Sequence, residues 1–298
     1  MRIFITGASG WIGSAATAEL LEAGHEVVGL ARTDAAAEAI VAAGAIAHRG
    51  SLDDLDSLAA GAEAADGVIH LGFNHDFSDM AGAGRTERAA VTVLGDTLAG
   101  SDRPFLFASG LAFLAPGRIA TEDDHSLMNG PDAPRGGGSN LALSYSEKGV
   151  RTVALRFPPT VHGEGDHGFM AELVRVARAT GSSAYIGDGT NRWPAVHRND
   201  AAHLVRLALD HGPAGSVVHA TGEEGVAARD IAAAIGSELD LPISSVAAED
   251  AAAHFGWIGA FFATDMPASS ALTRERYNWT PTHPTLIEDL EAGRYTRS

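Results

Sequence analysis

The sequence lacks cysteine, long apolar runs and any excess of positive charge, and each absence excludes a class of site or partner. Without a cysteine in its 298 residues, the chain forms no disulfide and offers no thiolate ligand to a metal. A formal net charge of −17 argues against nucleic acid and anionic membranes as partners. No apolar run approaches the length of a membrane span, and the first residues differ from a secretory leader. We therefore expect a cytoplasmic protein without a membrane partner.

The sequence does contain enough apolar material for a large core. Hydrophobic residues make up 45% of it, which suits one α/β domain with an appended smaller lobe. Short apolar strands followed by helix-like runs predict a Rossmann-type, doubly wound parallel sheet built from residues 1–165 and about 196–225. Residues of about 166–195 and 226–298 are predicted to form a smaller, discontinuous C-terminal lobe that binds the substrate.

The strongest motif is a glycine pattern at the first turn of the chain. Arg2 to Thr6 form a short apolar strand, and Gly7, Gly10 and Gly13 lead from it into a helix. Gly7 permits the tight turn, Gly10 lets the backbone approach a pyrophosphate, and Gly13 lets the helix pack against the strand. The free N–H groups at the helix start then face the phosphate charge. This pattern predicts dinucleotide binding.

The end of the second strand indicates which dinucleotide is bound. The strand Val27 to Leu30 is followed by Arg32, without the acidic residue that binds the ribose 2′-OH in NAD-selective folds. Arg32 is placed to meet a 2′-phosphate, and Asp34 is predicted to cap the next helix. We predict NADP(H) rather than NAD(H); the alternative is that Arg32 is a solvated loop residue.

The glycine motif and its setting resemble the short-chain dehydrogenase/reductase superfamily, specifically its extended branch of NAD(P)-dependent epimerase/dehydratase-like proteins. The resemblance implies a small-molecule substrate and, at the level of the family, a homodimer. It also implies cofactor contacts from the glycine loop and from residues that follow several strands. The predicted cofactor-binding residues are Gly7, Ser9, Gly10, Trp11, Ile12, Gly13, Arg32, Ser51, Leu52, Leu71, Gly72, Phe73 and Pro158.

The resemblance further implies a catalytic serine. Pro104 to Gly110 are predicted to form the fifth strand, and Ser109 lies at its carboxyl end, where open α/β sheets bind ligands. The family has its catalytic serine at this place, bonding a substrate oxygen, and we assign that role to Ser109. A tyrosine and a lysine four residues apart follow on the next helix of the family. That tyrosine transfers a proton to or from the substrate.

This sequence does not contain that pair. Tyr145 and Lys148 are three residues apart and lie next to the sixth strand, which starts near Arg151. Alignment of the helix places Arg135 where the family has tyrosine and Ser139 where it has lysine. Arg135 is therefore a catalytic-site candidate that binds an anionic substrate or polarises a carbonyl. It does not release a proton near neutral pH.

A substitute proton donor is expected in the loop after the sixth strand. This loop resembles the family's Val-Tyr-Gly-Pro-Gly stretch, with His162 in the tyrosine place. Histidine titrates near neutrality, so His162 is the first candidate for a general acid and His167 the second. The alternative is a loop histidine that only packs. Asp166 and Glu164 lack the helical spacing of a metal site, and no metal is predicted.

Two further groups have competing interpretations. His70 lies inside an apolar strand, which favours a hydrogen-bonded core histidine over a catalytic one. The lobe aromatics Phe255, Trp257, Phe261 and Phe262 either line an apolar pocket or form the lobe's core, and the core is favoured.

Together these observations predict an NADPH-dependent reductase of a small carbonyl compound, or the reverse alcohol oxidation. Nicotinamide supplies the hydride, Ser109 holds the substrate oxygen, and His162 or water supplies the proton. One alternative is a nucleotide-sugar epimerase or dehydratase, which the missing tyrosine disfavours. Another is a non-enzymatic NADP(H)-binding redox sensor or regulatory protein.

Overall fold

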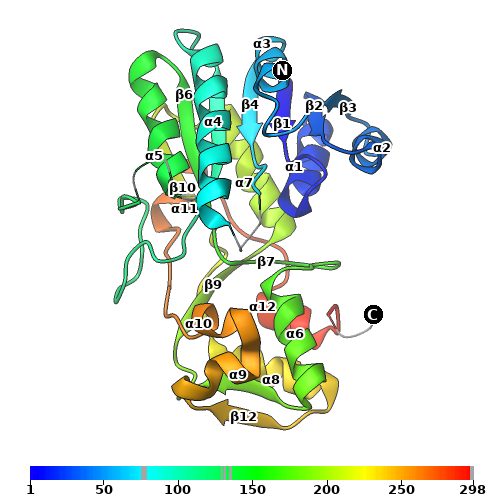
Figure 1. Ribbon diagram of the computed structural model, residues 1–298, viewed down its shortest axis with the longest axis vertical. Helices are drawn as coiled ribbons and strands as arrows, with labels where there is room; N and C mark the ends of the chain where they lie inside the picture. Colours follow the sequence, from blue (N-terminus) through cyan, green and yellow to red (C-terminus); the bar gives the residue numbers. More distant parts are fainter. Residues whose placement is uncertain (75–78, 129, 131, 134–135, 296–298) are drawn as a thin grey trace.

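The computed structural model describes residues 1–74, 79–128, 130, 132–133 and 136–295. Figure 1 shows a larger part built on a sheet and a smaller lobe below the carboxyl ends of its strands. Within the described ranges, none of the helices has the length and apolarity needed to cross a bilayer.

The larger part is a seven-stranded sheet in the order β10-β6-β5-β4-β1-β2-β3, and all its neighbouring strands are parallel. The chain leaves β1 toward one edge and returns to β4 on its other side, which makes the ends of β1 and β4 the switch point where ligands bind in such sheets. The predicted Rossmann-type parallel fold is confirmed. The strands are β1 (Arg2–Thr6), β2 (Glu26–Ala31), β3 (Ile46–Arg49), β4 (Gly67–His70), β5 (Pro104–Gly110), β6 (Arg151–Phe157) and β10 (Ser216–His219).

Helices cover both faces of this sheet because successive strand residues point to opposite sides. In β1, Ile3 and Ile5 join the core under α1 (Trp11–Glu22), α2 (Asp34–Ala42) and α7 (Arg198–His211). Phe4 joins the core under α3 (Leu55–Glu63), α4 (Met80–Leu98) and α5 (Gly136–Ser144). A short 3₁₀ segment, η1 (Tyr145–Lys148), connects α5 to the sheet.

One predicted helix cap is wrong. The side chain of Thr33 accepts a hydrogen bond from the Ala36 N–H at 3.2 Å and caps α2, whereas Asp34 is the first residue of the helix. Asp34 instead pairs with Arg49 across a 2.9 Å contact. Threonine and aspartate both favour the cap position, so the sequence alone does not decide which of these two adjacent residues caps the helix.

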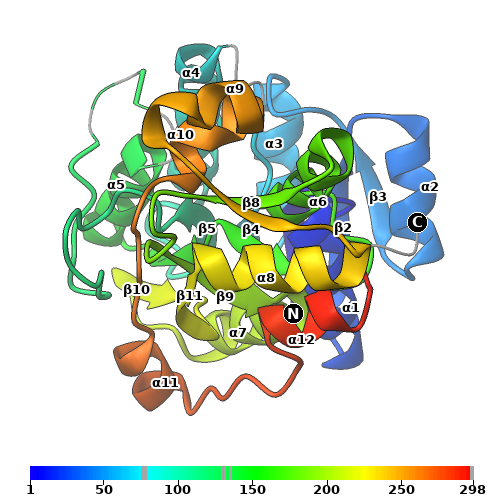
Figure 2. The same ribbon diagram turned by 90° about the horizontal axis from the view of Figure 1, so that it is seen from below.

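The lobe has its own small sheets and its own hydrophobic core. Figure 2 shows β8 and α8 in front of the large sheet when the molecule is seen from below. One three-stranded sheet contains β7 (Thr160–His162), β9 (Arg192–His197) and β11 (Glu223–Ala227), and a parallel pair contains β8 (Ser183–Ile186) and β12 (Ile243–Val246). The helical elements are α6 (Phe169–Thr180), α8 (Ala228–Leu239), η2 (Ala248–Asp250), α9 (Ala251–Phe255), η3 (Gly256–Ile258), α10 (Gly259–Phe262) and α12 (Leu286–Glu291).

One C-terminal segment returns to the larger part. Helix α11 (Ala271–Tyr277) contacts α7 and β10, and Tyr277 and Trp279 belong to the core of the large sheet. The predicted division of the chain, which places all of 226–298 in the lobe, does not include this return. The domain boundaries otherwise stay a prediction.

Candidate active site

The glycine-rich turn between β1 and α1 has the geometry of a phosphate cradle. Gly7 has a φ of +73°, and a Cβ there would lie 2.8 Å from the backbone nitrogen of Gly72. A Cβ on Gly13 would lie 1.9 Å from the Gly7 carbonyl oxygen. Helix α1 starts after Gly10 without a side-chain cap and without an acidic residue in its first turn. Its N-terminal N–H groups therefore remain available to an anion, and the turn fits the pyrophosphate of a dinucleotide.

The Trp11 side chain connects this cradle to β7 and to the loop that follows it. Its Nε1 donates a hydrogen bond to the Val161 carbonyl at 2.7 Å, and the guanidinium of Arg198 lies 4.0 Å from the ring centroid. Arg198 also donates to the Ser14 hydroxyl at 2.9 Å, and burial lowers the pKa of Arg198. The His167 ring meets the indole edge-on. The indole of Trp11 therefore packs against protein, and its backbone N–H is the group left to face a cofactor.

The other predicted cofactor residues follow the carboxyl ends of β2, β3, β4 and β6, which share one edge of the sheet with the cradle. Arg32 is exposed and forms no hydrogen bond or ion pair with the rest of the described chain. The Thr6 hydroxyl accepts from the Gly72 N–H at 3.0 Å and lies 2.7 Å from His70 Nδ1. His70 is 2% exposed, which confirms it as a hydrogen-bonded core histidine. The residues at this edge are Arg32, Ser51, Leu52, Leu71, Gly72, Phe73 and Pro158.

Ser109 lies at the carboxyl end of β5, within a row of polar side chains that crosses three strands. Ser109 is the register partner of Arg156 on β6, and Arg156 is the partner of His219 on β10. All three residues are buried. The Ser109 hydroxyl makes no hydrogen bond to another described residue, so its capacity to donate is unused.

Arg156 is a site residue that the sequence reasoning missed, although an arginine in an otherwise apolar strand was a usable signal. His219 Nδ1 lies 2.8 Å from the Ser269 carbonyl, so that nitrogen carries the proton and Nε2 accepts from Arg156 at 3.3 Å. No carboxylate among the described residues forms an ion pair with Arg156. Burial lowers the pKa of Arg156 to about 10, against the opposing charges of Asp124 and Glu122. A buried positive charge therefore stands next to Ser109.

Tyr145 and Lys148 lie at the opposite end of α5 from this edge, near the start of β6. The Tyr145 hydroxyl donates to Asp96 Oδ1 at 2.9 Å, and burial together with Asp96 raises the pKa of Tyr145 to about 12. Lys148 is exposed and lies 3.5 Å from the same carboxylate. Neither side chain belongs to the site.

Of the two residues aligned with the missing pair, Arg135 lies outside the described residues. Ser139 in α5 is buried, and its hydroxyl has no hydrogen-bond partner in the described part of the chain. Glu87 of α4 packs against Gly138, where a Cβ would lie 2.7 Å from Oε2.

The structure places His162 in a cluster with charged side chains, of which His162 and Asp289 are buried and Arg294 reaches the surface. The His162 Nδ1 lies 2.7 Å from Asp289 Oδ2, and its Nε2 lies 3.8 Å from Glu223 Oε2. Asp289 is fully buried and also pairs with Arg294 Nε at 2.9 Å, while burial raises the pKa of Glu223. We call these four residues the junction network. At 1% exposure, His162 is shielded from a dissolved substrate in this arrangement.

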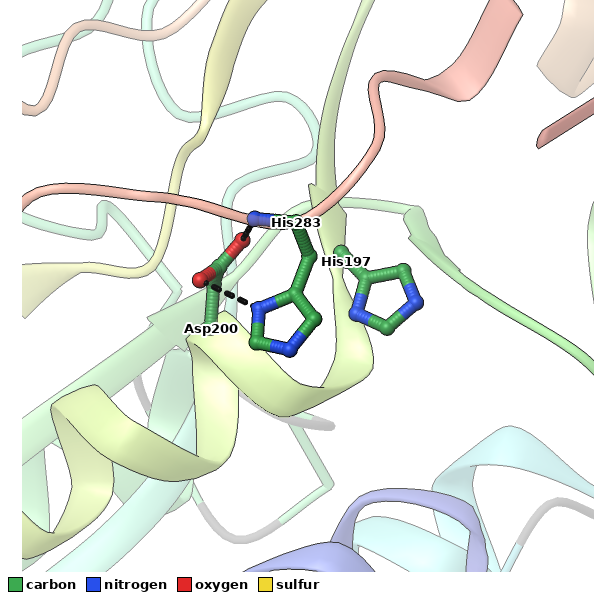
Figure 3. A group of neighbouring side chains, drawn as sticks. All are labelled: His197, Asp200 and His283. Carbon is green, nitrogen blue, oxygen red and sulfur yellow. Dashed lines mark hydrogen bonds and ion pairs between the residues drawn. The ribbon is translucent and has the colours of Figure 1, made fainter. Parts of the chain in front are cut away.

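A second histidine group lies close by, at the start of α7 (Figure 3). Its members His197, Asp200 and His283 bring possible metal-ligand atoms within 4.8 Å of one another. However, the Asp200 carboxylate accepts from the backbone N–H groups of Thr282 and His283 and pairs with His283 Nδ1. The His197 Nδ1 accepts from the Asn199 N–H, and burial lowers the pKa of His197 to about 4. The Asp200 carboxylate and the Nδ1 atoms of both histidines are therefore engaged within the protein, and the bonds of Asp200 anchor the C-terminal segment to α7.

Comparison with known proteins agrees with the dinucleotide-binding geometry of the glycine-rich turn. Residues 3–220 match the model of the NAD dependent epimerase/dehydratase family. The chain belongs to this family. The resemblance to the extended short-chain dehydrogenase/reductases is therefore confirmed, and the chain joins NAD(P)-binding oxidoreductases and epimerase-like enzymes of that group.

Three relatives illustrate the range of similarity. An uncharacterized protein of Schizosaccharomyces pombe is 47% identical over 296 residues, which is 99% of this chain and 100% of that protein. The 4-hydroxy-2-methyl-3-oxo-4-farnesyl-3,4-dihydroquinoline-1-oxide ketoreductase of Stigmatella aurantiaca is 28% identical over 74% of this chain and 68% of its own. The dTDP-glucose 4,6-dehydratase DesIV of Streptomyces venezuelae superposes with a TM-score of 0.78 at 20% identity, covering 100% of this chain and 97% of that one. The last likeness shows the fold.

Proposed function

We propose that this protein is an NADP(H)-dependent reductase of a carbonyl compound, or catalyses the reverse alcohol oxidation. The observation that carries the proposal is the open phosphate cradle at the same sheet edge as the unbonded hydroxyl of Ser109. The bound nicotinamide supplies hydride chemistry. A ketoreductase among the relatives supports this reaction class.

The chain's own groups then act on the substrate oxygen. Ser109 donates its hydroxyl hydrogen bond to that oxygen, and the buried charge of Arg156 beside it stabilises the negative charge that develops there. The proton that completes the alcohol comes from water, because His162 is shielded. We assign His162 a positioning role, in which its bond to Asp289 holds the loop after β7 in place.

The preference for NADP(H) rests on the charges beyond β2. Arg32 is exposed and unpaired among the described residues. The carboxylate of Asp34 is engaged by Arg49, which ends β3 and is the register partner of Ala31. This edge thus carries two guanidinium groups and one carboxylate, a balance that favours a 2′-phosphate over a free 2′-OH.

The test measures NADPH and NADH consumption by the pure protein against a broad carbonyl panel. We expect turnover with NADPH, and Arg32→Gln should raise the KM for NADPH about tenfold or more while changing that for NADH little. Arg276→Gln, on the exposed side of α11, is the matched control. Equal KM values for the two cofactors in the native protein would contradict the assignment of Arg32. Tight NADPH binding without turnover would favour the redox-sensor alternative.

A further inference from the structure

The aromatic side chains near the site divide into a buried and an exposed set. Phe255 and Phe262 are 3% and 1% exposed and belong to the lobe's core, as favoured from the sequence. Trp257 is 55% exposed, and Phe113 in the loop after β5 is 59% exposed. Aromatic rings open to solvent on this scale need an explanation other than core packing.

The exposed rings belong to one continuous surface. Centroid distances of 5.5 Å, 5.0 Å and 5.8 Å join Phe113 to Phe261, Phe261 to Phe169, and Phe169 to Trp257. Phe169 and Phe261 both rest on the fully buried Trp193. We call Phe113, Phe169, Trp257 and Phe261 the aromatic surface.

The aromatic surface lies where the loop after β5 meets the lobe, beside the start of α6. Phe113 follows Ser109 by four residues, and the adjacent Ala112 packs against the lobe's core. Phe169 is the first residue of α6, directly after the loop that leaves β7. In Figure 1, α6 and α10 lie in the lobe below the carboxyl edge of the large sheet. The surface therefore joins the segment that follows Ser109 to helices of the lobe.

The backbone of Phe113 is strained, and its contacts do not account for the strain. Its φ is +61°, a left-handed conformation that bulky residues rarely adopt. Asp240 and Asn278, which share this conformation, end helices α8 and α11, and Asp102, which also shares it, is of a residue type that adopts it more readily than phenylalanine. Phe113 ends no helix, and more than half of its surface remains exposed. Such strain is typical of ligand-binding positions.

The charged groups around the aromatic surface are already neutralised. Glu172 accepts from Trp257 Nε1 at 3.1 Å and forms two hydrogen bonds with the guanidinium of Arg175. Arg192, next to Trp193 in the chain, forms two such bonds with Asp265. These arginines are therefore engaged rather than available to the diphosphate of a nucleotide sugar.

We propose that the aromatic surface binds a flat apolar part of the substrate, so that the substrate is a ketone or aldehyde bearing an aromatic or fused-ring group. This inference rests on the proposed carbonyl reduction and adds the substrate class. Phe113, four residues after Ser109 and in ring contact with Phe261, is the member of this surface that selects such compounds by stacking.

The test uses 2-acetylnaphthalene as the probe, with dihydroxyacetone as a small polar ketone. Binding of the probe is measured by calorimetry on protein saturated with NADP⁺, where no reduction occurs, and kcat/KM is measured for both ketones with NADPH. Phe113→Ala should raise the Kd for 2-acetylnaphthalene about tenfold. It should also lower, by a similar factor, the kcat/KM for 2-acetylnaphthalene relative to that for dihydroxyacetone. Ile243→Ala, an exposed apolar residue on β12, should change neither.

Phe113→Gly separates the ring from the strain. It should lose the same affinity as Phe113→Ala and melt at a higher temperature than Phe113→Ala, because glycine adopts positive φ freely. This comparison keeps the test meaningful if removal of the ring alters stability.

The outcomes distinguish the two proposals. Binding of 2-acetylnaphthalene that depends on Phe113, without turnover of any ketone, would keep the aromatic surface and remove the reductase assignment. Turnover of small ketones, with equal probe affinity in native and Phe113→Ala protein, would keep the reductase and overturn the aromatic surface. Failure of the native protein to bind the probe would also overturn it.

Discussion

The site edge and the junction network are both rich in buried polar groups, but they differ in how those groups are satisfied. At the edge, the start of α1 has no side-chain cap, Ser109 donates to no described residue, and Arg156 has a histidine rather than a carboxylate beside it. In the junction network, His162 and Arg294 both meet the carboxylate of Asp289, and His162 Nε2, which makes no hydrogen bond to a described residue, faces the carboxylate of Glu223 at 3.8 Å. Unused hydrogen-bonding capacity indicates a ligand site, whereas charges paired within the protein indicate structure.

The largest effect that would test this comparison comes from Gly13→Ala. A Cβ there would lie 1.9 Å from the Gly7 carbonyl oxygen, so the cradle must open, and we expect NADPH affinity to fall at least about 100-fold, measured by calorimetry. Gly24→Ala is the control, because Gly24 has a φ of +82° but its Cβ would meet nothing within 4 Å. That variant should lose about 1 kcal/mol of stability and keep its affinity. Near-native NADPH binding by Gly13→Ala would remove the cradle from the site.

Asp289→Asn should reduce stability rather than cofactor binding. Asp289 is fully buried, and its loss of charge weakens the hydrogen bond with His162 and leaves Arg294 with Glu164 as its remaining carboxylate partner. We expect urea unfolding to show a loss of about 3–5 kcal/mol, with an unchanged Kd for NADPH in the folded protein. Asp56→Asn, exposed in the first turn of α3, should change the free energy of unfolding by about 0.5 kcal/mol or less. A fall in kcat without loss of stability would instead make the junction network part of the chemistry.

Ser109→Ala, unlike Asp289→Asn, should reduce turnover rather than stability. Loss of one hydrogen-bond donor at the substrate oxygen should lower kcat about 100-fold, or about 2.7 kcal/mol, and leave the Kd for NADPH unchanged. The control is Ser237→Ala, exposed on α8. Native turnover by the Ser109 variant would show that the unused hydroxyl is not at the reacting centre.

The smallest effect concerns pH. Burial lowers the pKa of His219 to about 4, below the ordinary value of about 6.5. Between these two pH values the histidine therefore binds a proton in the unfolded chain but not in the folded chain. Stability should be full above about pH 6.5 and fall as the pH drops toward 4, by on the order of 1–2 kcal/mol between pH 7.5 and 5. His219→Gln should flatten this dependence in urea unfolding, and His211→Gln, exposed at the end of α7, should not. An unchanged slope in His219→Gln would mean that other groups, His197 among them, set the acid sensitivity.

The sequence predicted those features that depend on short-range sterics. The glycine spacing has a local reason at every position, and a serine at the end of a buried strand must lie at the sheet edge. The cap of α2 shows the limit of this reasoning, because Thr33 and Asp34 both suit the position and one residue separates them.

The features that the sequence did not predict depend on contacts between distant segments. His162 and Asp289 are 127 residues apart, and nothing near either one indicates the other. The histidine was therefore interpreted from its loop alone, as a proton donor. Phe113 poses a related problem, because a positive φ at a phenylalanine has no signature in composition or spacing. Arg156 was readable in principle, as the only charged residue between Thr152 and Phe157.

The indole of Trp11 gives the protein a built-in optical reporter. Of the four tryptophans, Trp193 and Trp279 are buried and Trp257 lies in the lobe, so Trp11, the first residue of α1, is the one that adjoins the proposed pyrophosphate cradle. Its surroundings include a guanidinium over one face and an imidazole ring nearly perpendicular to it, with centroids 5.8 Å apart, and both groups affect indole emission. Titration with a dinucleotide should therefore change the intrinsic fluorescence without any added label, and Trp11→Phe should remove that signal.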